Sequence, residues 1–519
     1  MEKAIYINCW TDPWLKVAEL IKEKYGIEPG YWIGYREEQR ETLVRSTFPN
    51  AIYHNDLDAW CGRFPEEIER HFSEEQLDAD FINANSQYEL IALKMLDRVD
   101  PTQHSFSFSE RQRHVRNLFR KWMYCLKLVN PRFVVTPMVP HRVYDYTMYV
   151  VCKYMNVPFV FFNHTPFDGR CITLCDYYTI GDMFINDYVK YKGERVENFA
   201  IDDDVLSSFE KNKMDYRVAR PAYMVKNEAV DKQWNSTIKI IMHTMRRFIS
   251  VRRNLWGKDG YLRNWVWGPY YKQDEKTLME NSYNTLPAYL RHNVGGLHYI
   301  KELKRHYESL TVKPDYKEKY VVLFLHYQPE ATTCPIGNIF VDQELCVDML
   351  LKHLPEEYNV YIKEHPSQFY ANSEGQLGRI KETYYDLVKK PRVRLMSTSE
   401  VSFDLIEHSE AVATVSGTVG WESIVRGKPT IIFGMTWYEN YDKGCLRVTD
   451  DASASRMMSF INNYSYDENA LRAYLASVSQ NTIKAYFYKA VHKDKMLVSE
   501  AECIDNLSTA IMSQVVKRH

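Results

Sequence analysis

The sequence lacks several features that would place a chain of 519 residues in a specialised class. Its ten cysteines form no CxxC pair, so the paired ligands of a structural zinc ion are missing, and we expect buried, reduced thiols. No apolar run approaches the roughly 20 residues that span a bilayer, and residues 1–8 show no signal-peptide pattern. We therefore expect a cytoplasmic protein, soluble or peripheral at the inner face of the membrane.

Excess charge of one sign is also missing. Lys and Arg number 66 against 68 for Asp and Glu, a balance that argues against a nucleic-acid binder. No Asp-x-Asp motif follows a strand, so we expect neither a metal ion nor a cofactor. We interpret Asp202-Asp-Asp204 as the acidic start of a helix. What the chain does have is aromatic side chains, 14% of the total, whose flat apolar bodies and polar edges suit sugars and interfaces.

Short strand-like runs alternate with helical patterns in both halves of the chain. This alternation is typical of βαβ units and predicts parallel sheets. We expect an α/β protein with two Rossmann-like domains that face a central cleft, which is the GT-B architecture, plus a helical insertion. The expected strands cover 4–8, 132–136 and 158–162 in the first half, and 320–325, 359–363, 411–415 and 429–433 in the second.

Changes in composition divide the chain into four parts. We expect an acceptor-side domain at 1–201, a helical insertion at 202–312, a nucleotide-sugar domain at 313–465 and a helical tail at 466–519. Between Lys211 and Lys272 there are 14 Lys or Arg against 4 Asp or Glu, with tryptophans interleaved. This segment is either a surface for anionic lipid or glycan, to which Arg252 and Arg253 would contribute, or an insertion with merely solvated charges.

The most informative motifs follow predicted strands of the second half. Lys363-Glu-His-Pro366 presents His365 at a strand end, where a protonated imidazole can donate to a phosphate oxygen and Lys363 adds positive charge. Ser416-Gly-Thr418 follows another strand and opens a helix, whose free backbone N–H groups suit a phosphate. Glu422 lies one turn further and can accept from ribose hydroxyls. The alternative is an ordinary helix cap without a ligand.

These motifs carry a resemblance. His365-Pro366 with Ser416-Gly417-Thr418 resembles the paired motifs of GT-B glycosyltransferases that use CMP-sugars. More narrowly, the second half is similar to the bacterial capsule polysaccharide biosynthesis family that includes β-Kdo transferases. The segment Leu325-His-Tyr-Gln-Pro-Glu330 also resembles a strand-to-loop motif of surface-glycan synthesis proteins. The resemblance implies that Gln328 and Glu330 join Lys363 and Pro366 in donor binding, and it implies retaining transfer without a metal ion.

The first half offers acid–base candidates after two of its strands. His141 and Asp145 are four residues apart, so both face the cleft if a helix begins near Pro140. Asp145 is the candidate nucleophile or base, and capping of the helix is the equally weighted alternative. His164 and Asp168, after the next strand, are reserve candidates.

The sequence thus predicts transfer of Kdo or another nonulosonic acid from a CMP-linked donor to a surface-polysaccharide acceptor, itself a glycan or a lipid-linked glycan. Two other enzymes remain open: a CDP-glycerol-type glycerophosphotransferase and a UDP-sugar GT-B transferase. An epimerase would need further carboxylates around the sugar, which the sequence does not reveal. A non-catalytic polysaccharide-assembly subunit is the alternative of another class.

Overall fold

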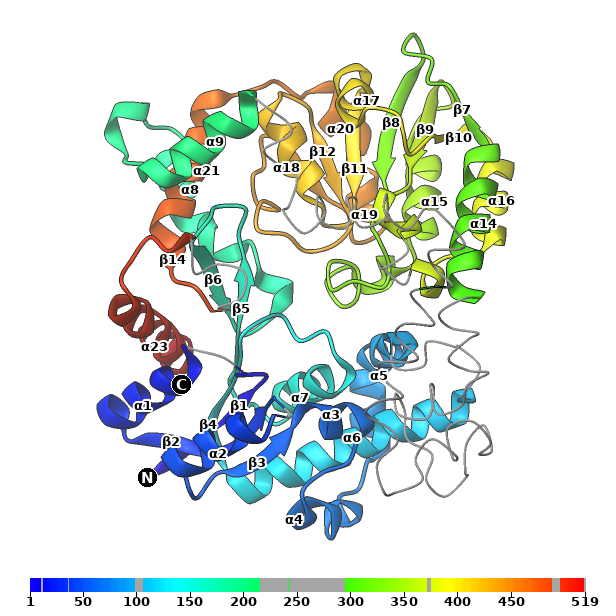
Figure 1. Cartoon of the computed structure of the whole chain (residues 1–519). Coiled ribbons are helices and arrows are strands. Elements are labelled where there is room, and N and C mark those ends of the chain that lie inside the picture. The colour runs from blue at the N-terminus through cyan, green and yellow to red at the C-terminus, as the bar shows by residue number, and fades with distance from the viewer. Residues whose placement is uncertain are drawn as a thin grey trace.

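The computed structural model describes residues 1–10, 13–35, 37–98, 106–214, 242, 295–370, 375–487 and 495–517. It consists of two α/β halves, each built on one seven-stranded sheet (Figure 1). The basic aromatic segment, with Arg252 and Arg253, lies outside the described residues. The predicted α/β class with two Rossmann-like halves is confirmed.

The first sheet has the strand order β14-β6-β5-β4-β1-β2-β3. Strands β1 to β5 pair in parallel, whereas β6 is antiparallel to both β5 and β14. The strands are β1 (Glu2–Ile7), β2 (Ile27–Gly34), β3 (Ile52–Asn55), β4 (Pro131–Thr136), β5 (Phe159–His164), β6 (Arg170–Leu174) and β14 (Ile483–Lys484).

The second sheet is parallel throughout, in the order β13-β12-β11-β8-β9-β10-β7. Its strands are β7 (Thr311–Val312), β8 (Lys319–Phe324), β9 (Tyr358–Lys363), β10 (Val393–Met396), β11 (Ala411–Thr414), β12 (Thr430–Ile432) and β13 (Cys445–Arg447). β7 thus lies at the end of residues 202–312, the range that the sequence predicted to be a helical insertion.

Both sheets are covered on both faces, as alternating side chains require. In β1, Ile5 and Ile7 enter one apolar cluster while Ala4 and Tyr6 enter another across the sheet. The helices of the first half are α1 (Trp14–Tyr25), α2 (Glu38–Thr47), α3 (Asp56–Cys61), α4 (Glu66–Glu69), α5 (Ala79–Met95), α6 (Phe108–Val129), α7 (Val143–Tyr154), α8 (Ile185–Tyr191) and α9 (Asp203–Met214). All ten cysteines are free and buried, as predicted.

The helices of the second half follow its strands in the manner of βαβ units. They are α14 (Gly296–Ser309), α15 (Glu344–His353), α16 (Lys381–Lys389), α17 (Ser402–His408), α18 (Thr418–Val425), α19 (Asp451–Ala454) and α20 (Met457–Asn462). Within the described part of the chain, no helix is both long and apolar enough to cross a membrane.

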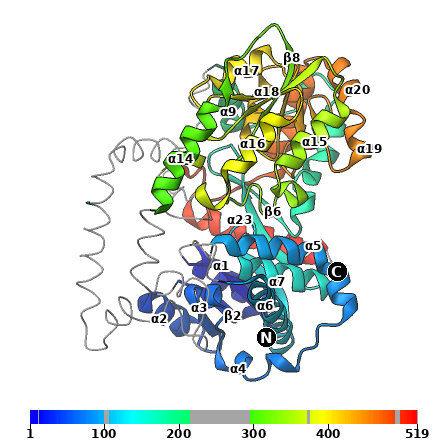
Figure 2. The same ribbon diagram turned by 90° about the vertical axis from the view of Figure 1, so that its right-hand side faces the viewer.

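The tail returns to the first half instead of forming a separate unit. It contains α21 (Glu468–Asn481), β14 and α23 (Glu500–Lys517). α21 packs against α8, β14 joins the edge of the first sheet, and α23 packs against α1, next to the N-terminal strands (Figures 1 and 2). The segment predicted as purely helical therefore also supplies a strand.

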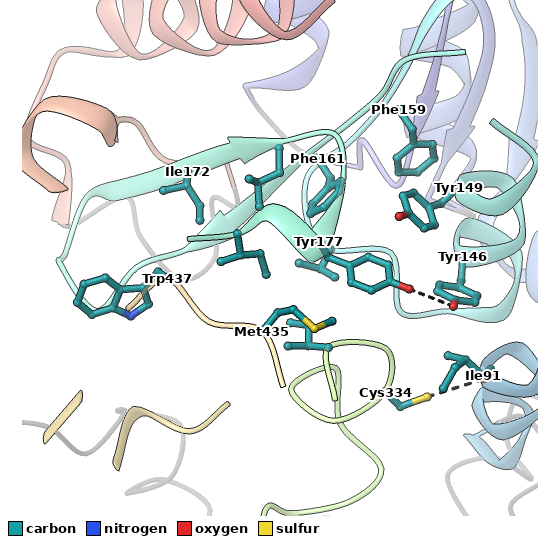
Figure 3. Close-up of a cluster of buried hydrophobic side chains, with 14 of the residues drawn as sticks. Ile91, Tyr146, Tyr149, Phe159, Phe161, Ile172, Tyr177, Cys334, Met435 and Trp437 are labelled. Carbon is teal, nitrogen blue, oxygen red and sulfur yellow. Dashed lines mark hydrogen bonds between the residues drawn. The ribbon is translucent and has the colours of Figure 1, made fainter. Parts of the chain in front are cut away.

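The two halves share one continuous apolar cluster. Phe161, Ile172 and Tyr177 of the first half lie opposite Met435 and Trp437 of the second (Figure 3). Nearby, the Gly181 N–H donates to Glu439 Oε1 across the interface at 3.0 Å. Such a shared core fixes the two halves in one relative arrangement.

Candidate donor site at three strand ends

Three neighbouring strands of the second sheet end in polar residues on the same edge. β8, β9 and β11 are followed by His326, His365 and Ser416, and the order β11-β8-β9 puts His326 in the middle. Carboxyl ends of parallel strands are where open α/β sheets bind their ligands. The structure therefore brings the two sequence-predicted motifs together, with a second histidine between them.

His326 holds the loop after β11. The Ser416 N–H donates to His326 Nε2 at 3.1 Å, and Thr414 Oγ1 lies 3.0 Å from the same nitrogen. Because the Ser416 amide can only donate, Nε2 is unprotonated and the ring proton is on Nδ1. Burial is the main cause that lowers the pKa of His326 to about 3, so the ring stays neutral. Sequence reasoning took Gln328 and Glu330 from this segment and missed His326, although it directly follows a predicted strand.

His365 has the opposite tautomer to His326, with the ring proton on Nε2. Its Nδ1 accepts from the Ser367 N–H at 3.2 Å, which leaves the proton on Nε2. Burial, followed by the nearby charge of Lys363, lowers the pKa of His365 to about 4. The sequence-based expectation of an imidazolium therefore needs changing: at neutral pH the donor is a neutral Nε2–H. Pro366 begins the 3-10 turn Pro366–Phe369 that orients the ring.

Lys363 acts on this site through its charge. Its side chain is buried, and Nζ donates to Ser402 Oγ at 2.8 Å. The ammonium is therefore held beside the sheet edge, where it keeps His365 unprotonated.

The loop after β11 leads into α18 with no side-chain cap. Gly417 is the N-cap residue and makes no side-chain cap bond, while its own N–H donates to Thr414 Oγ1 at 3.3 Å. A Cβ on Gly417 would lie 2.8 Å from Thr414 Oγ1 and 3.3 Å from His326 Nε2, so a larger residue must displace these side chains. Ser416 does not cap the helix, since its Oγ donates instead to the Thr332 carbonyl at 2.6 Å. An uncapped helix start favours anions.

Glu422 lies one turn into α18, as the sequence predicted. Burial raises its pKa to about 7, while Arg426 and a hydrogen bond from Thr418 act in the opposite direction. Thr418 is exposed and Glu422 half-buried.

Gln328 and Glu330 support the loop after β8. Gln328 is buried, its Nε2 donates to the Val341 carbonyl at 2.6 Å, and its backbone N–H donates to Gln368 Oε1 at 2.9 Å. Glu330 accepts from the Thr332 hydroxyl at 2.8 Å, and burial raises its pKa. Both side chains are thus engaged within the protein.

A buried ion pair lies beneath the two histidines. Arg379 Nε donates to Glu364 Oε2 at 3.0 Å, and Arg379 Nη2 donates to the His326 carbonyl at 3.2 Å. Glu364 Oε1 accepts from the His365 N–H at 2.8 Å, and Oε2 accepts from the Tyr384 hydroxyl at 2.7 Å. This pair therefore positions both rings through their backbones.

Asp145 in the first half has the capping role that the sequence left open. α7 begins at Val143, so Asp145 is its third residue and accepts from the Arg142 N–H at 2.8 Å. Its other oxygen accepts from Asn8 Nδ2 at 2.9 Å, and the side chain is fully buried. Burial raises the pKa of Asp145 to about 7.

His141 precedes this helix and is half-buried. Its Nδ1 lies 2.8 Å from the Val139 carbonyl, so the proton is on Nδ1 and Nε2 carries the lone pair. Burial, together with Arg98 and Arg142, lowers the pKa of His141 to about 3.

The reserve candidates contact the tail of the chain. Asp168 is exposed and forms a 2.8 Å ion pair with Lys495, whereas the His164 ring packs on Phe487 at a centroid distance of 4.5 Å. Asp202 and Asp204 both pair with the buried Arg170, which explains the acidic run at the start of α9. No group of three side chains suited to a metal ion occurs among the described residues.

Comparison with known proteins gives one family. Residues 334–488 match the family model described as "Capsule polysaccharide biosynthesis protein". Over 98 residues the chain is 26% identical to "Capsule polysaccharide modification protein LipA" of Neisseria meningitidis, a match that covers 19% of this chain and 13% of the relative. The chain thus spans only a small part of this curated relative.

Two solved structures are similar to this chain at low sequence identity. One is KpsC of Thermosulfurimonas dismutans, described as a beta Kdo 2,7 transferase, at 14% identity, 47% and 69% coverage of this chain and that chain, and a TM-score of 0.23. The other is the UDP-GlcNAc 2-epimerase of Methanocaldococcus jannaschii, at 10% identity, 92% and 99% coverage and a TM-score of 0.25. The family resemblance expected from His365-Pro366 and Ser416-Gly417-Thr418 is thus confirmed over residues 334–488: there, the chain is similar to capsule polysaccharide biosynthesis proteins.

Proposed function

We propose that this protein is a GT-B glycosyltransferase of surface-polysaccharide synthesis. Its donor would be a CMP-activated sugar, Kdo or another nonulosonic acid, and its acceptor a glycan or lipid-linked glycan. The observation that carries the proposal is the convergence of His365 Nε2–H and the uncapped start of α18 on the edge where β8, β9 and β11 end. Every one of these groups donates hydrogen bonds, which is what a departing nucleotide phosphate requires.

The proposed chemistry needs no metal ion. Negative charge develops on the nucleotide phosphate as the glycosidic bond to the sugar breaks. The backbone N–H groups at the start of α18 and His365 Nε2–H would stabilise that charge, helped by the helix dipole. Glu422, whose partner Thr418 is exposed at the same helix end, would accept from the ribose hydroxyls.

The first half would supply the group that acts on the acceptor. His141 Nε2 has no partner among the described residues, so it is placed to receive a proton, although a pKa of about 3 makes it a weak base. Asp145 would first have to leave its contacts with Arg142 and Asn8. His141 is therefore the better candidate for an inverting reaction, whereas the retaining outcome implied by the resemblance would require Asp145 to become accessible. We place the protein on the cytoplasmic side of the membrane, where activated sugars are available.

Nucleotide binding tests this function directly. Thermal shift and calorimetry with CMP, CDP, UMP, UDP and GDP should show selective stabilisation by CMP, because a ligand that binds only the folded state raises its melting temperature. His365→Ala should weaken CMP binding about tenfold, through loss of one hydrogen bond to a charged group. His408→Ala is the matched control. His408 is exposed at the end of α17, just before β11 begins, so it lies at the amino end of the strand and the proposed site at the carboxyl end.

The pattern of outcomes separates the alternatives. A preference for UDP or CDP would show that the donor is not CMP-linked, and the proposed phosphate-binding site would stand. No stabilisation by any nucleotide would refute the transferase and favour an assembly subunit without catalysis. Burial raises the pKa of Glu422 to about 7, so the affinity of the parent alone does not report on His365. Since His365 is neutral above about pH 4, the factor by which His365→Ala weakens CMP binding should be the same at pH 6 and at pH 8. A factor that falls about tenfold per pH unit would instead show that a protonated ring is needed.

A further inference from the structure

Two arginines of the first half lie beside His141. Arg98 comes shortly after α5, and its Nη1 donates to the His141 carbonyl at 3.4 Å. Arg142 follows His141 directly in the chain and precedes α7. Burial is the main cause that lowers the pKa of His141, and the positive charges of both arginines act in the same direction. We call Arg98 and Arg142 the arginine pair.

The Arg142 guanidinium is held in place along one side. It lies 4.3 Å from the Trp10 ring centroid and 5.7 Å from the Trp60 ring centroid. Its Nη1 donates to Asn8 Oδ1 at 3.3 Å and to the Tyr144 hydroxyl at 3.2 Å. Its Nε and Nη2 donate to none of the described residues, and neither nitrogen is sealed off from solvent. The edge formed by Nε and Nη2 is therefore open to a ligand.

Arg98 has the same edge open. The carboxylate of the neighbouring Asp97 is occupied by Lys94 and Arg111, at 2.8 and 2.7 Å. Among the residues that the structure describes, the Arg98 guanidinium donates to the His141 carbonyl alone, through Nη1. Its Nε and Nη2 are likewise reached by solvent. A guanidinium binds a carboxylate or a phosphate through this edge, with two parallel hydrogen bonds.

Carboxylates near the arginine pair do not use these edges. Asp56 and Asp145 lie within electrostatic range of Arg142, and Glu330 lies within electrostatic range of Arg98. Within the described part of the chain, none of the three forms an ion pair with either guanidinium. The Asp145 carboxylate accepts from a backbone N–H and an amide side chain instead, and Glu330 accepts from a threonine hydroxyl. The two open edges thus suit an anion that comes from outside the protein.

We propose that the arginine pair binds an anionic group, a carboxylate or a phosphate, of the acceptor glycan. The bound group lies beside His141 and holds the acceptor next to Nε2, the ring nitrogen that carries the lone pair. That the ligand is the acceptor rests on the proposed transferase. Binding of the anion itself rests only on the two guanidiniums.

Small anionic sugars test this proposal with the full chain. Saturation-transfer NMR would be recorded with glucuronate, glucose 1-phosphate and glucose. We expect at least one of the two anions to bind at millimolar concentration and glucose to bind at least about fivefold more weakly, because hydrogen bonds to charged groups are the stronger ones. Tighter binding of glucuronate would assign the site to the carboxylate of an acidic sugar, and tighter binding of glucose 1-phosphate to the phosphate of a linked glycan.

Arg98→Gln is the decisive variant, because its guanidinium makes a single contact and its loss should leave the fold intact. It should weaken binding of the anion at least about fivefold. Arg142→Lys keeps a positive charge but removes the open edge, so it should also weaken binding. Arg113→Gln, at an exposed arginine of α6, is the matched control and should bind as the parent does. The melting temperature of each variant would confirm that it is folded.

Each outcome bears on one site. If glucose binds as tightly as both anions, or if Arg98→Gln binds them as the parent does, the proposal is wrong. Binding that is lost in His365→Ala but kept in Arg98→Gln would place the anion at the donor site and refute the proposal as well. Selective stabilisation by CMP would then leave the proposed transferase intact. Conversely, anion binding that depends on Arg98, in a protein that no nucleotide stabilises, would keep the arginine pair and remove the transferase.

Discussion

Replacing Arg379 by methionine should destabilise the second half and weaken nucleotide binding together. Methionine keeps much of the side-chain volume but leaves the Glu364 carboxylate buried, with Tyr384 and the His365 N–H as its remaining donors. Removing one partner of a buried ion pair costs about 3–5 kcal/mol. The His326 carbonyl loses a donor as well, so both rings of the donor site become less well positioned.

The assay is urea unfolding followed by intrinsic fluorescence, with CMP titration of the folded variant. Glu364→Gln combined with Arg379→Met should be more stable than the sum of the two single losses, with a coupling of about 1–3 kcal/mol, because the double variant leaves no unpaired charge. Arg394→Met is the control, as Arg394 is exposed on β10 of the same sheet. A loss below about 1 kcal/mol for Arg379→Met, or strict additivity, would refute the reasoning.

Two further predictions follow from other parts of the structure. Gly417→Ala should lower the affinity for CMP about tenfold by displacing His326 and Thr414, and overpacking should cost about 1–3 kcal/mol of stability. Gly193→Ala is the control, because a Cβ there meets open space, and it should change neither the affinity nor the stability. Equal affinities of Gly417→Ala and the parent in calorimetry would contradict the displacement of His326 and Thr414. Burial raises the pKa of Asp145 to about 7, so its contribution to stability is complete below about pH 4 and is lost as pH rises towards 7. Between pH 5 and 8, Asp145→Asn should therefore gain about 2–3 kcal/mol on the parent in denaturant unfolding, and parallel pH profiles would count against this.

The sequence predicted much of the fold and two of the polar residues at the candidate donor site. Strands are recognised by their apolar runs, and residues just after parallel strands meet at one end of the sheet, which is why His365 and Ser416 lie close to each other. His326 follows the same rule but has no proline or glycine beside it to attract attention. Asp145 shows the limit of spacing arguments, because a helix start at Val143 instead of near Pro140 turns its carboxylate back onto Arg142.

Contacts between distant segments could not be predicted. Strand β14 has two residues and no strand-like pattern of its own, so nothing local shows that it pairs with β6. The shared apolar cluster has the same origin: Tyr177 and Trp437 come from different halves of the chain, and only the fold brings them into one core.

The return of the tail to the first half has a consequence for synthesis. Ala485, Tyr486 and Leu507 enter the same apolar cluster as Trp14 and Val17, and Trp14 Nε1 donates to the Phe487 carbonyl at 2.9 Å. Domains usually fold as they leave the ribosome, the N-terminal one first. Here the first half emerges with β4, β5 and β6 uncovered on one face of its sheet, because these strands lack α23 until it is translated. The second half, whose strands are contiguous in the chain, is free to fold before the first is finished.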